Sequence, residues 1–276
     1  MRLLSMRNLI FALFMVMAVT NVMYAGLEVV PKYIFLESPR RSVPIHINNS
    51  GDKDLEVWIE TKYGYVSSDD TGKITIVLDT TISAEDPSAA GWVKAFPERF
   101  ILGAGESQTV RFAAYPPPGL VVGEYWARVL ITGKPRKDVA ISKGQAGMTI
   151  LQRVGVPFHY RNGKVGTGLD VASANVVVSG NDVDIMMKLT KTGNASYWGS
   201  RIMRMISQNG TVVRASTRNV VVYKTLTLHD KLDRAGIASG VYLLEFEFIT
   251  GKRNDFADRE LVQSSPVRSS VSVVIP

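Results

Sequence analysis

Hydrophobic and polar residues alternate over most of this 276-residue chain, and no long stretch keeps the period of a helix. Short runs rich in valine, isoleucine, threonine and aromatic residues are separated by turn sequences such as NSGDK, SSDDTG and YPPPG. After residue 164 the same pattern begins again. About seven short strands, twice over, predict an all-β protein made of two β-sandwich domains.

An internal echo supports this division. The segment GEYWARVLITGKPR begins at Gly123 and GVYLLEFEFITGKRN begins at Gly240, a spacing of 117 residues. A tyrosine that follows a glycine turn early in a late strand is where immunoglobulin-like folds place a corner tyrosine. We therefore expect two immunoglobulin-like domains, at residues 26–162 and 163–276, with the boundary in the glycine-rich segment RNGKVGTG (161–168).

Residues 1–25 have the pattern of a secretory signal peptide. Arg2 and Arg7 precede the apolar run LIFALFMVMAV, and Ala25 supplies a small residue for cleavage. We expect export to the periplasm, with no membrane insertion after signal removal; a retained N-terminal anchor is the alternative. Removal of the two arginines lowers the net charge from +7 to +5.

The most informative stretch is GMTILQRVGVPFHYRNGKV, residues 147–165. From position 148 to 160 every second residue is apolar or aromatic, apart from one glutamine: Met148, Ile150, Gln152, Val154, Val156, Phe158 and Tyr160. Pro157 interrupts the opposite row, and a central strand does not tolerate proline. The pattern predicts a long edge strand with one apolar face, a feature that invites pairing with another chain.

Catalytic and cofactor chemistry find little support. The chain has no cysteine, and His46, His159 and His229 stand in separate segments without zinc-site spacing. No G-x-S-x-G elbow, phosphate-binding loop or nucleic-acid motif occurs, and no pair of acids is singled out for glycosidase chemistry. We expect no enzyme activity, no metal, no cofactor and no nucleic-acid partner.

Several segments in order resemble the PapD-like periplasmic pilus-assembly chaperones, mainly over residues 27–162. They are VVPKYIFLES, VPIHINNSG, DLEVWIET, FPERFILGAGESQTVRF and GMTILQRVGVPFHYR. The resemblance implies a divergent member with a boomerang of two immunoglobulin-like domains. Its implied function is to bind and stabilise pilus or fimbrial subunits and deliver them to an outer-membrane usher.

In the resembling proteins the chaperone lends an edge strand to a subunit that lacks its last strand, which is β-strand addition. Carried over residue by residue, the donor positions are Met148, Ile150, Gln152 and Val154. Val156, Phe158 and Tyr160 continue the same row into the chaperone.

The resemblance also implies two basic residues that hold the subunit's C-terminal carboxylate. Lys32 stands where an arginine is usual, and the usual lysine position falls on Pro157, a departure from the family pattern. Arg153 has the opposite parity from the donor row, as a cleft residue should. We expect the anchor among Lys32, Arg153 and, on the neighbouring strand, Arg128.

Other functions stay open. A secreted β-sandwich binding or structural module, adhesin-like, would share the fold alone. An uncharacterised hydrolase is a third reading. Self-dimerisation is one way in which the edge strand could be covered in the absence of a subunit.

Overall fold

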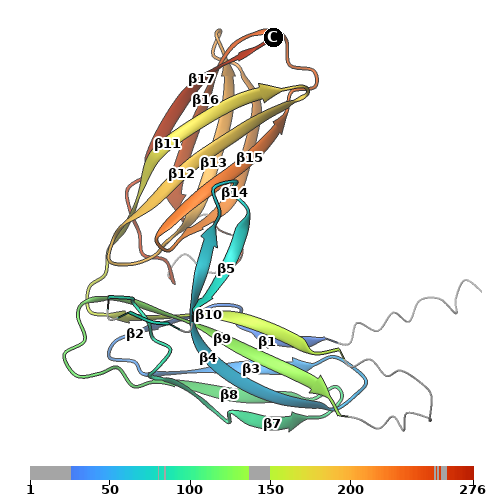
Figure 1. Cartoon of the computed structure of the whole chain (residues 1–276), viewed down its shortest axis with the longest axis vertical. Helices are drawn as coiled ribbons and strands as arrows, with labels where there is room; N and C mark the ends of the chain where they lie inside the picture. Colours follow the sequence, from blue (N-terminus) through green and yellow to red (C-terminus); the bar gives the residue numbers. More distant parts are fainter. Residues whose placement is uncertain are drawn as a thin grey trace, which may run out of the picture.

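The computed structural model describes residues 26–79, 81–83, 85–136, 150–251, 253, 255 and 260–276. These residues form strands, turns and loops, which confirms the all-β prediction. Figure 1 shows two elongated sandwiches that meet at an elbow. Among the described residues there is no helix with the length and apolar character needed to cross a membrane. The predicted signal peptide, residues 1–25, lies outside the described residues.

The strands follow one another along the chain in two groups. The first group is β1 (Leu27–Val30), β2 (Ile34–Glu37), β3 (Ser42–Asn49), β4 (Leu55–Ser68), β5 (Ile74–Asp79), β6 (Val93–Phe96), β7 (Arg99–Leu102), β8 (Ser107–Ala114), β9 (Gly123–Pro135) and β10 (Gln152–Asn162). The second group is β11 (Thr167–Ser179), β12 (Asp182–Gly193), β13 (Tyr197–Ser207), β14 (Val212–Val222), β15 (Thr225–Asp233), β16 (Gly240–Thr250) and β17 (Val267–Ile275).

In the first sandwich, the sheet β1-β3-β8-β6 faces the sheet β2-β10-β9-β4-β5, with β7 also paired to β4. Alternate residues of the strands turn inward; on β3 these include Ile45 and Ile47, and on β8 Val110 and Phe112, all fully buried. Each such side chain contributes about 1.5–3 kcal/mol on burial. The alternation seen in the sequence is therefore the pattern of a two-sheet core.

In the second sandwich, β11-β12-β15 faces β14-β13-β16-β17. The echo in the sequence has a structural counterpart. The Tyr125 hydroxyl donates a hydrogen bond to the Val121 carbonyl, and the Tyr242 hydroxyl donates to the Ala238 carbonyl, each four residues upstream and each at 2.9 Å. Both domains thus close a corner with the same tyrosine contact.

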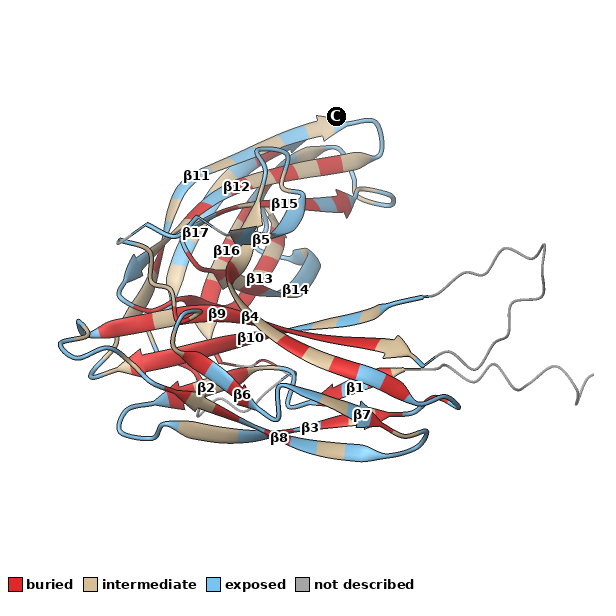
Figure 2. Ribbon diagram, turned by 60° about the horizontal axis from the view of Figure 1, so that its bottom comes forward, coloured by how far each residue is buried: buried red, intermediate tan, exposed pale blue. Residues whose placement is uncertain are grey.

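The two sandwiches share a buried aromatic cluster at the elbow. It contains Tyr63 and Trp126 of the first sandwich with Trp198 and Tyr223 of the second, and the rings of Trp126 and Tyr223 lie 4.8 Å apart. The β4–β5 hairpin rises from the first sandwich to lie beside β14 and β15 (Figure 1), and its Ser68 hydroxyl accepts a hydrogen bond from the backbone N–H of Thr227 at 2.6 Å. Buried residues dominate the parts of β9 and β10 that reach the elbow (Figure 2).

Candidate functional site: an open strand edge beside an interdomain pocket

Strand β10 is paired unequally on its two sides. Along its whole length, Gln152–Asn162, it pairs with β9 in antiparallel register. On the other side, β2 pairs in parallel with Phe158–Arg161 only. Among the described residues, no strand pairs with residues 153–157 on that side. Pro157 lies within this stretch, where its missing N–H breaks no ladder on the open side.

The apolar row of β10 runs from the core to the surface. Val156, Phe158 and Tyr160 are buried in the first core, and Val154 packs against it. Further out, the side-chain oxygen of Gln152 accepts a hydrogen bond from the Leu27 N–H at 2.8 Å, so this polar side chain ties the start of β1 to the row.

Beyond the strand, Ile150 is 62% exposed and continues the apolar row. Met148, the outermost predicted donor position, lies outside the described residues.

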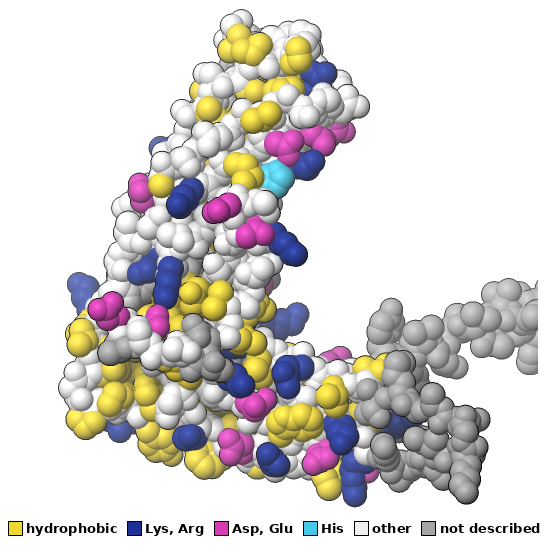
Figure 3. Space-filling view, viewed as in Figure 1, with side chains coloured by type: hydrophobic (Ala, Val, Ile, Leu, Met, Phe, Trp, Pro, Cys, Tyr) yellow, Lys and Arg dark blue, Asp and Glu magenta, His cyan; other side chains and the backbone are white. Residues whose placement is uncertain are grey.

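A pocket of about 700 Å³ lies next to the open edge, between the two sandwiches. Figure 3 shows hydrophobic side chains gathered around this elbow. The pocket wall is mostly apolar and aromatic, with contributions from the start of the chain, from β4, β9 and β10, and from the second sandwich. It comprises Leu27, Glu28, Val29, Val30, Lys32, Tyr33, Val66, Arg128, Val154, Gly155, Val156, Pro157, Trp198, Val221 and Tyr223.

Arg128 is the buried charge of this pocket. It lies on β9 opposite Pro157 and is 4% exposed. Its Nε and Nη2 atoms are buried without a hydrogen-bond partner. Burial lowers the pKa of the Arg128 guanidinium, against a smaller opposing influence from Tyr223 and Tyr33. A guanidinium stays charged even so, and an uncompensated buried cation is strongly unfavourable until an anion pairs with it.

The other two predicted anchor residues lie differently. Lys32 is exposed and belongs to the pocket wall, in the turn between β1 and β2. Arg153 is about half exposed; its Nε donates to the Thr132 hydroxyl at 2.9 Å, and its Nη2 lies 3.8 Å from the Glu60 carboxylate. Arg153 is not part of the pocket wall. The structure therefore brings Lys32 and Arg128 together at the pocket and places Arg153 further out along the edge.

A buried ionic network, not anticipated from the sequence, sits behind the pocket. The Glu124 carboxylate accepts hydrogen bonds from Arg161 Nε at 3.0 Å, Trp126 Nε1 at 2.9 Å and the Ser196 backbone N–H at 3.0 Å, and also contacts the Ser196 hydroxyl. Burial alone would raise the pKa of Glu124, but His159 and Arg161 outweigh it and hold that pKa far below its usual range.

His159 joins this network to the second sandwich. Its Nδ1 lies 3.2 Å from Glu124, and its Nε2 lies 3.1 Å from the Tyr223 hydroxyl. Complete burial lowers the pKa of His159. A neutral imidazole satisfies both contacts, because Nδ1–H donates to the carboxylate and Nε2 accepts the tyrosine hydroxyl. The sequence contained one signal for this network. Two polar residues, His159 and Arg161, stand at odd positions of β10, on the face opposite its apolar row.

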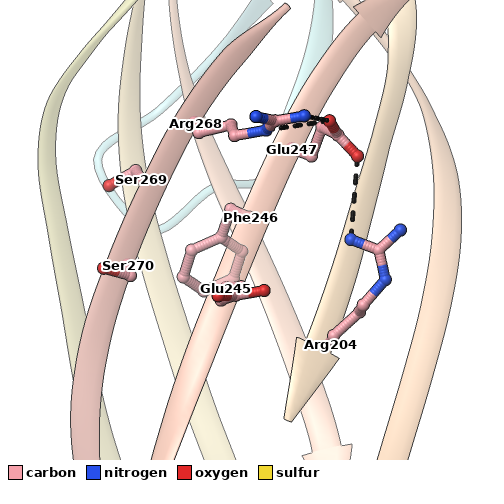
Figure 4. A pocket seen from close by; sticks show the side chains of 7 residues that line it. All are labelled: Arg204, Glu245, Phe246, Glu247, Arg268, Ser269 and Ser270. Carbon is pink, nitrogen blue, oxygen red and sulfur yellow. Dashed lines mark hydrogen bonds and ion pairs between the residues drawn. The ribbon is translucent and has the colours of Figure 1, made fainter. Parts of the chain in front are cut away.

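A second hollow, of about 580 Å³, lies on the outer face of β13, β16 and β17. Figure 4 shows Glu247 between Arg268 and Arg204, at 2.7 and 3.6 Å. One carboxylate thus pairs with both guanidinium groups there. In the part of the chain that the structure describes, no cluster of three or more histidine, aspartate or glutamate residues could hold a metal ion.

No family model and no curated protein matches this sequence. Among solved structures, a chain of the Acinetobacter baumannii CsuC–CsuE chaperone–tip adhesion subunit pre-assembly complex is 12% identical, with 88% of this chain and 98% of that chain covered and a TM-score of 0.44. A chain of the Salmonella enterica SafA pilin–SafB chaperone complex is 13% identical, with 89% and 96% covered and a TM-score of 0.43.

The Pseudomonas aeruginosa CupB2 chaperone is 10% identical to this chain, with 90% of this chain and 100% of that chain covered and a TM-score of 0.38. At such identities the similarity concerns the fold alone. The three alignments cover most of this chain and most of each of those chains.

Proposed function

We propose that this chain is a non-enzymatic periplasmic chaperone that captures pilus or fimbrial subunits by lending them the outer half of β10. One observation carries the proposal. The apolar row of β10 leaves the core at Val154, continues to exposed Ile150, and runs along a stretch whose far side has no strand partner among the described residues. A subunit that lacks one strand would complete its backbone ladder there, and its pockets would receive the alternate apolar side chains.

The neighbouring pocket supports the same function. A subunit strand paired with β10 brings its C-terminus toward the elbow, where Arg128 offers two buried nitrogens without partners. A carboxylate accepts hydrogen bonds from a guanidinium in a bidentate arrangement, which fixes register as well as adding energy. We assign Arg128 as the principal anchor and Lys32 as a second cation at the rim; Arg153 stays a candidate for a contact further along the edge. Delivery to an outer-membrane usher is part of the proposal.

The test is capture of a client. The mature chain is expressed in a bacterial periplasm with the small secreted proteins encoded beside it, and the complex is purified and identified. We expect a one-to-one complex with a subunit that is unstable alone. A monomer or self-dimer without any such client would contradict the proposal and favour a binding module of the adhesin-like kind.

Ile150→Asp with Leu151→Asp as its matched control locates the contact. These neighbours are 62% and 53% exposed and directly precede β10, but only Ile150 has the parity of its apolar row. We expect Ile150→Asp to abolish capture by a folded protein and Leu151→Asp to leave capture largely intact. Equal losses of capture in the two variants would show that the client does not recognise the apolar row.

A further inference from the structure

The β4–β5 hairpin carries an exposed apolar row that strand donation by β10 does not use. Ile74, Ile76 and Leu78 of β5 are 43%, 55% and 44% exposed. Because alternate residues of a strand point to the same face, these three side chains form one row. In the described chain β5 pairs with β4 only, so it forms the opposite edge of the sheet from β2 and β10. Large apolar side chains grouped on a surface mark an interaction site more often than scattered ones do.

This row is continuous with the interdomain pocket. Ile76 is the register partner of Val66, and Val66 belongs to the pocket wall. Directly opposed residues of an antiparallel pair present their side chains on the same face.

Leu78, the end of the row, also lies close to the pocket, on the other side of Gly64. The position that a Gly64 Cβ would occupy is 2.7 Å from Leu78 Cδ2 and 3.2 Å from Arg128 Cβ. The absence of a side chain at Gly64 thus lets the end of the row approach Arg128.

The hairpin is held in place before any partner arrives. Near its tip, Ser68 accepts the hydrogen bond from Thr227, and a Cβ at Gly72 would stand 2.5 Å from His229 Cβ. Gly72 also has a φ of 81°, which a glycine adopts without strain. A surface fixed in this way loses little conformational entropy on binding.

We propose that Ile74, Ile76 and Leu78 form a second contact surface for the client subunit. This inference rests on the proposed function. A subunit whose C-terminal carboxylate sits at Arg128 lies between two edges of one sheet: β10 completes its fold, and the β5 row packs against apolar surface beside its C-terminal segment. The continuity of the row with the Arg128 pocket favours the client over a second copy of this chain as its occupant.

The experiment measures the affinity of the full mature chain for the subunit that co-purifies with it. Ile76→Asp should weaken binding by at least about tenfold, as expected for truncating an interface anchor. The matched control is Ile101→Asp. Ile101 is also 55% exposed and also lies on a short strand paired with β4, but it pairs with Glu56 at the far end, away from the pocket. Binding by this control should change by less than about twofold.

The outcomes separate this inference from the function on which it rests. If Ile150→Asp abolishes capture while Ile76→Asp behaves like Ile101→Asp, the row is not a client contact and the chaperone function stands. If Ile76→Asp alters self-association in sedimentation and leaves capture intact, the occupant is a second copy and the inference is wrong. Absence of capture by the wild-type chain overturns both. Should Ile76→Asp fail to fold, Ile76→Ser gives the same comparison with a smaller perturbation.

Discussion

Two buried arginines on neighbouring strands have opposite surroundings. Arg161 of β10 and Arg128 of β9 are equally buried near the same elbow. Arg161 donates to Glu124, to Glu37 at 2.9 Å and to the Glu260 carbonyl at 2.9 Å. Arg128 lies in the pocket with Nε and Nη2 unpartnered.

The difference separates a guanidinium that is already fully hydrogen-bonded from one whose buried nitrogens can still pair with an anion. In a fully hydrogen-bonded buried ion pair, removal of either partner leaves the other as an unpaired buried charge, which is strongly destabilising. An unpaired buried cation lowers the stability of the free protein, and strain of this kind persists at functional sites. An anion that reaches Arg128 therefore recovers free energy that the free chain lacks.

The largest expected effect is the loss of stability on removing Arg161, the fully hydrogen-bonded arginine. Arg161→Met leaves Glu124 buried with one charged partner fewer, and we expect the free energy of unfolding to fall by about 3–5 kcal/mol. Urea unfolding followed by tryptophan fluorescence measures it. A loss below about 1 kcal/mol would mean that the network tolerates an unpaired carboxylate and that Arg161 and Arg128 differ little in their contribution to stability.

Arg128→Met should behave in the opposite way. It removes a buried charge without a partner, so we expect unchanged or higher stability, while affinity for the client falls by about 100-fold because the carboxylate loses its counter-charge. Arg128→Lys keeps the charge without the planar fork and should give an intermediate affinity. Calorimetric titration measures the affinity. Undiminished binding by Arg128→Met would transfer the anchor role to Lys32 or Arg153.

Acid should weaken the elbow in two stages. The folded pKa of His159 lies below its ordinary 6.5, so the unfolded chain binds more protons and stability is lost as pH falls below about 6.5. The folded pKa of Glu124 is also depressed, so its contribution is complete above about 4.5 and is lost as pH falls further. Each group limits the slope to about 1.4 kcal/mol per pH unit.

Urea midpoints measured from pH 8 to pH 4 test this order. In Glu124→Gln the slope below pH 5 should shrink relative to wild type. A wild-type profile that is flat between pH 7 and pH 5 would contradict the assignment of a neutral, buried His159.

The smallest effect is expected at the outer hollow of the second sandwich. Glu247 is 16% exposed there and is shared by Arg204 and the largely exposed Arg268. Glu247→Gln should leave both the melting temperature and client affinity within the reproducibility of the wild type. A loss of client binding in this variant would place a partner contact on the far face of the second domain and shift attention from the elbow.

Local patterns in the sequence predicted much of this architecture. Alternation marked the strands, and the tyrosines after Gly123 and Gly240 marked corners that the structure closes with equivalent hydrogen bonds. Pro157 marked a strand with an open edge, because proline cannot supply the N–H that a central strand needs; among the described residues that edge is limited to residues 153–157, since β2 pairs with Phe158–Arg161. These features depend on neighbours within a few residues, which a sequence displays directly.

The site depends on contacts that a sequence does not display. Arg153 and Arg128 were both candidate anchors from the sequence, and Arg128 is the one that lies with Trp198 and Tyr223 of the second sandwich in the pocket wall. Trp198 on β13 and Tyr223 in the turn between β14 and β15 complete the pocket, and both belong to segments whose own pattern is that of an ordinary sandwich. Residues 1–25 and Met148 lie outside the described residues, so the signal peptide and the outermost donor position stay predictions.

The elbow has a consequence for the order in which this molecule becomes competent. Strands β1 to β10 can pair among themselves once residue 162 has been made, but the wall of the pocket includes Trp198, Val221 and Tyr223. Domains generally fold as units. In the proposed chaperone, β10 would therefore be available to a client once the first domain has folded, whereas the pocket at Arg128 would be complete only once the second domain has folded too. A chain with the first domain alone would hold a client without setting its register.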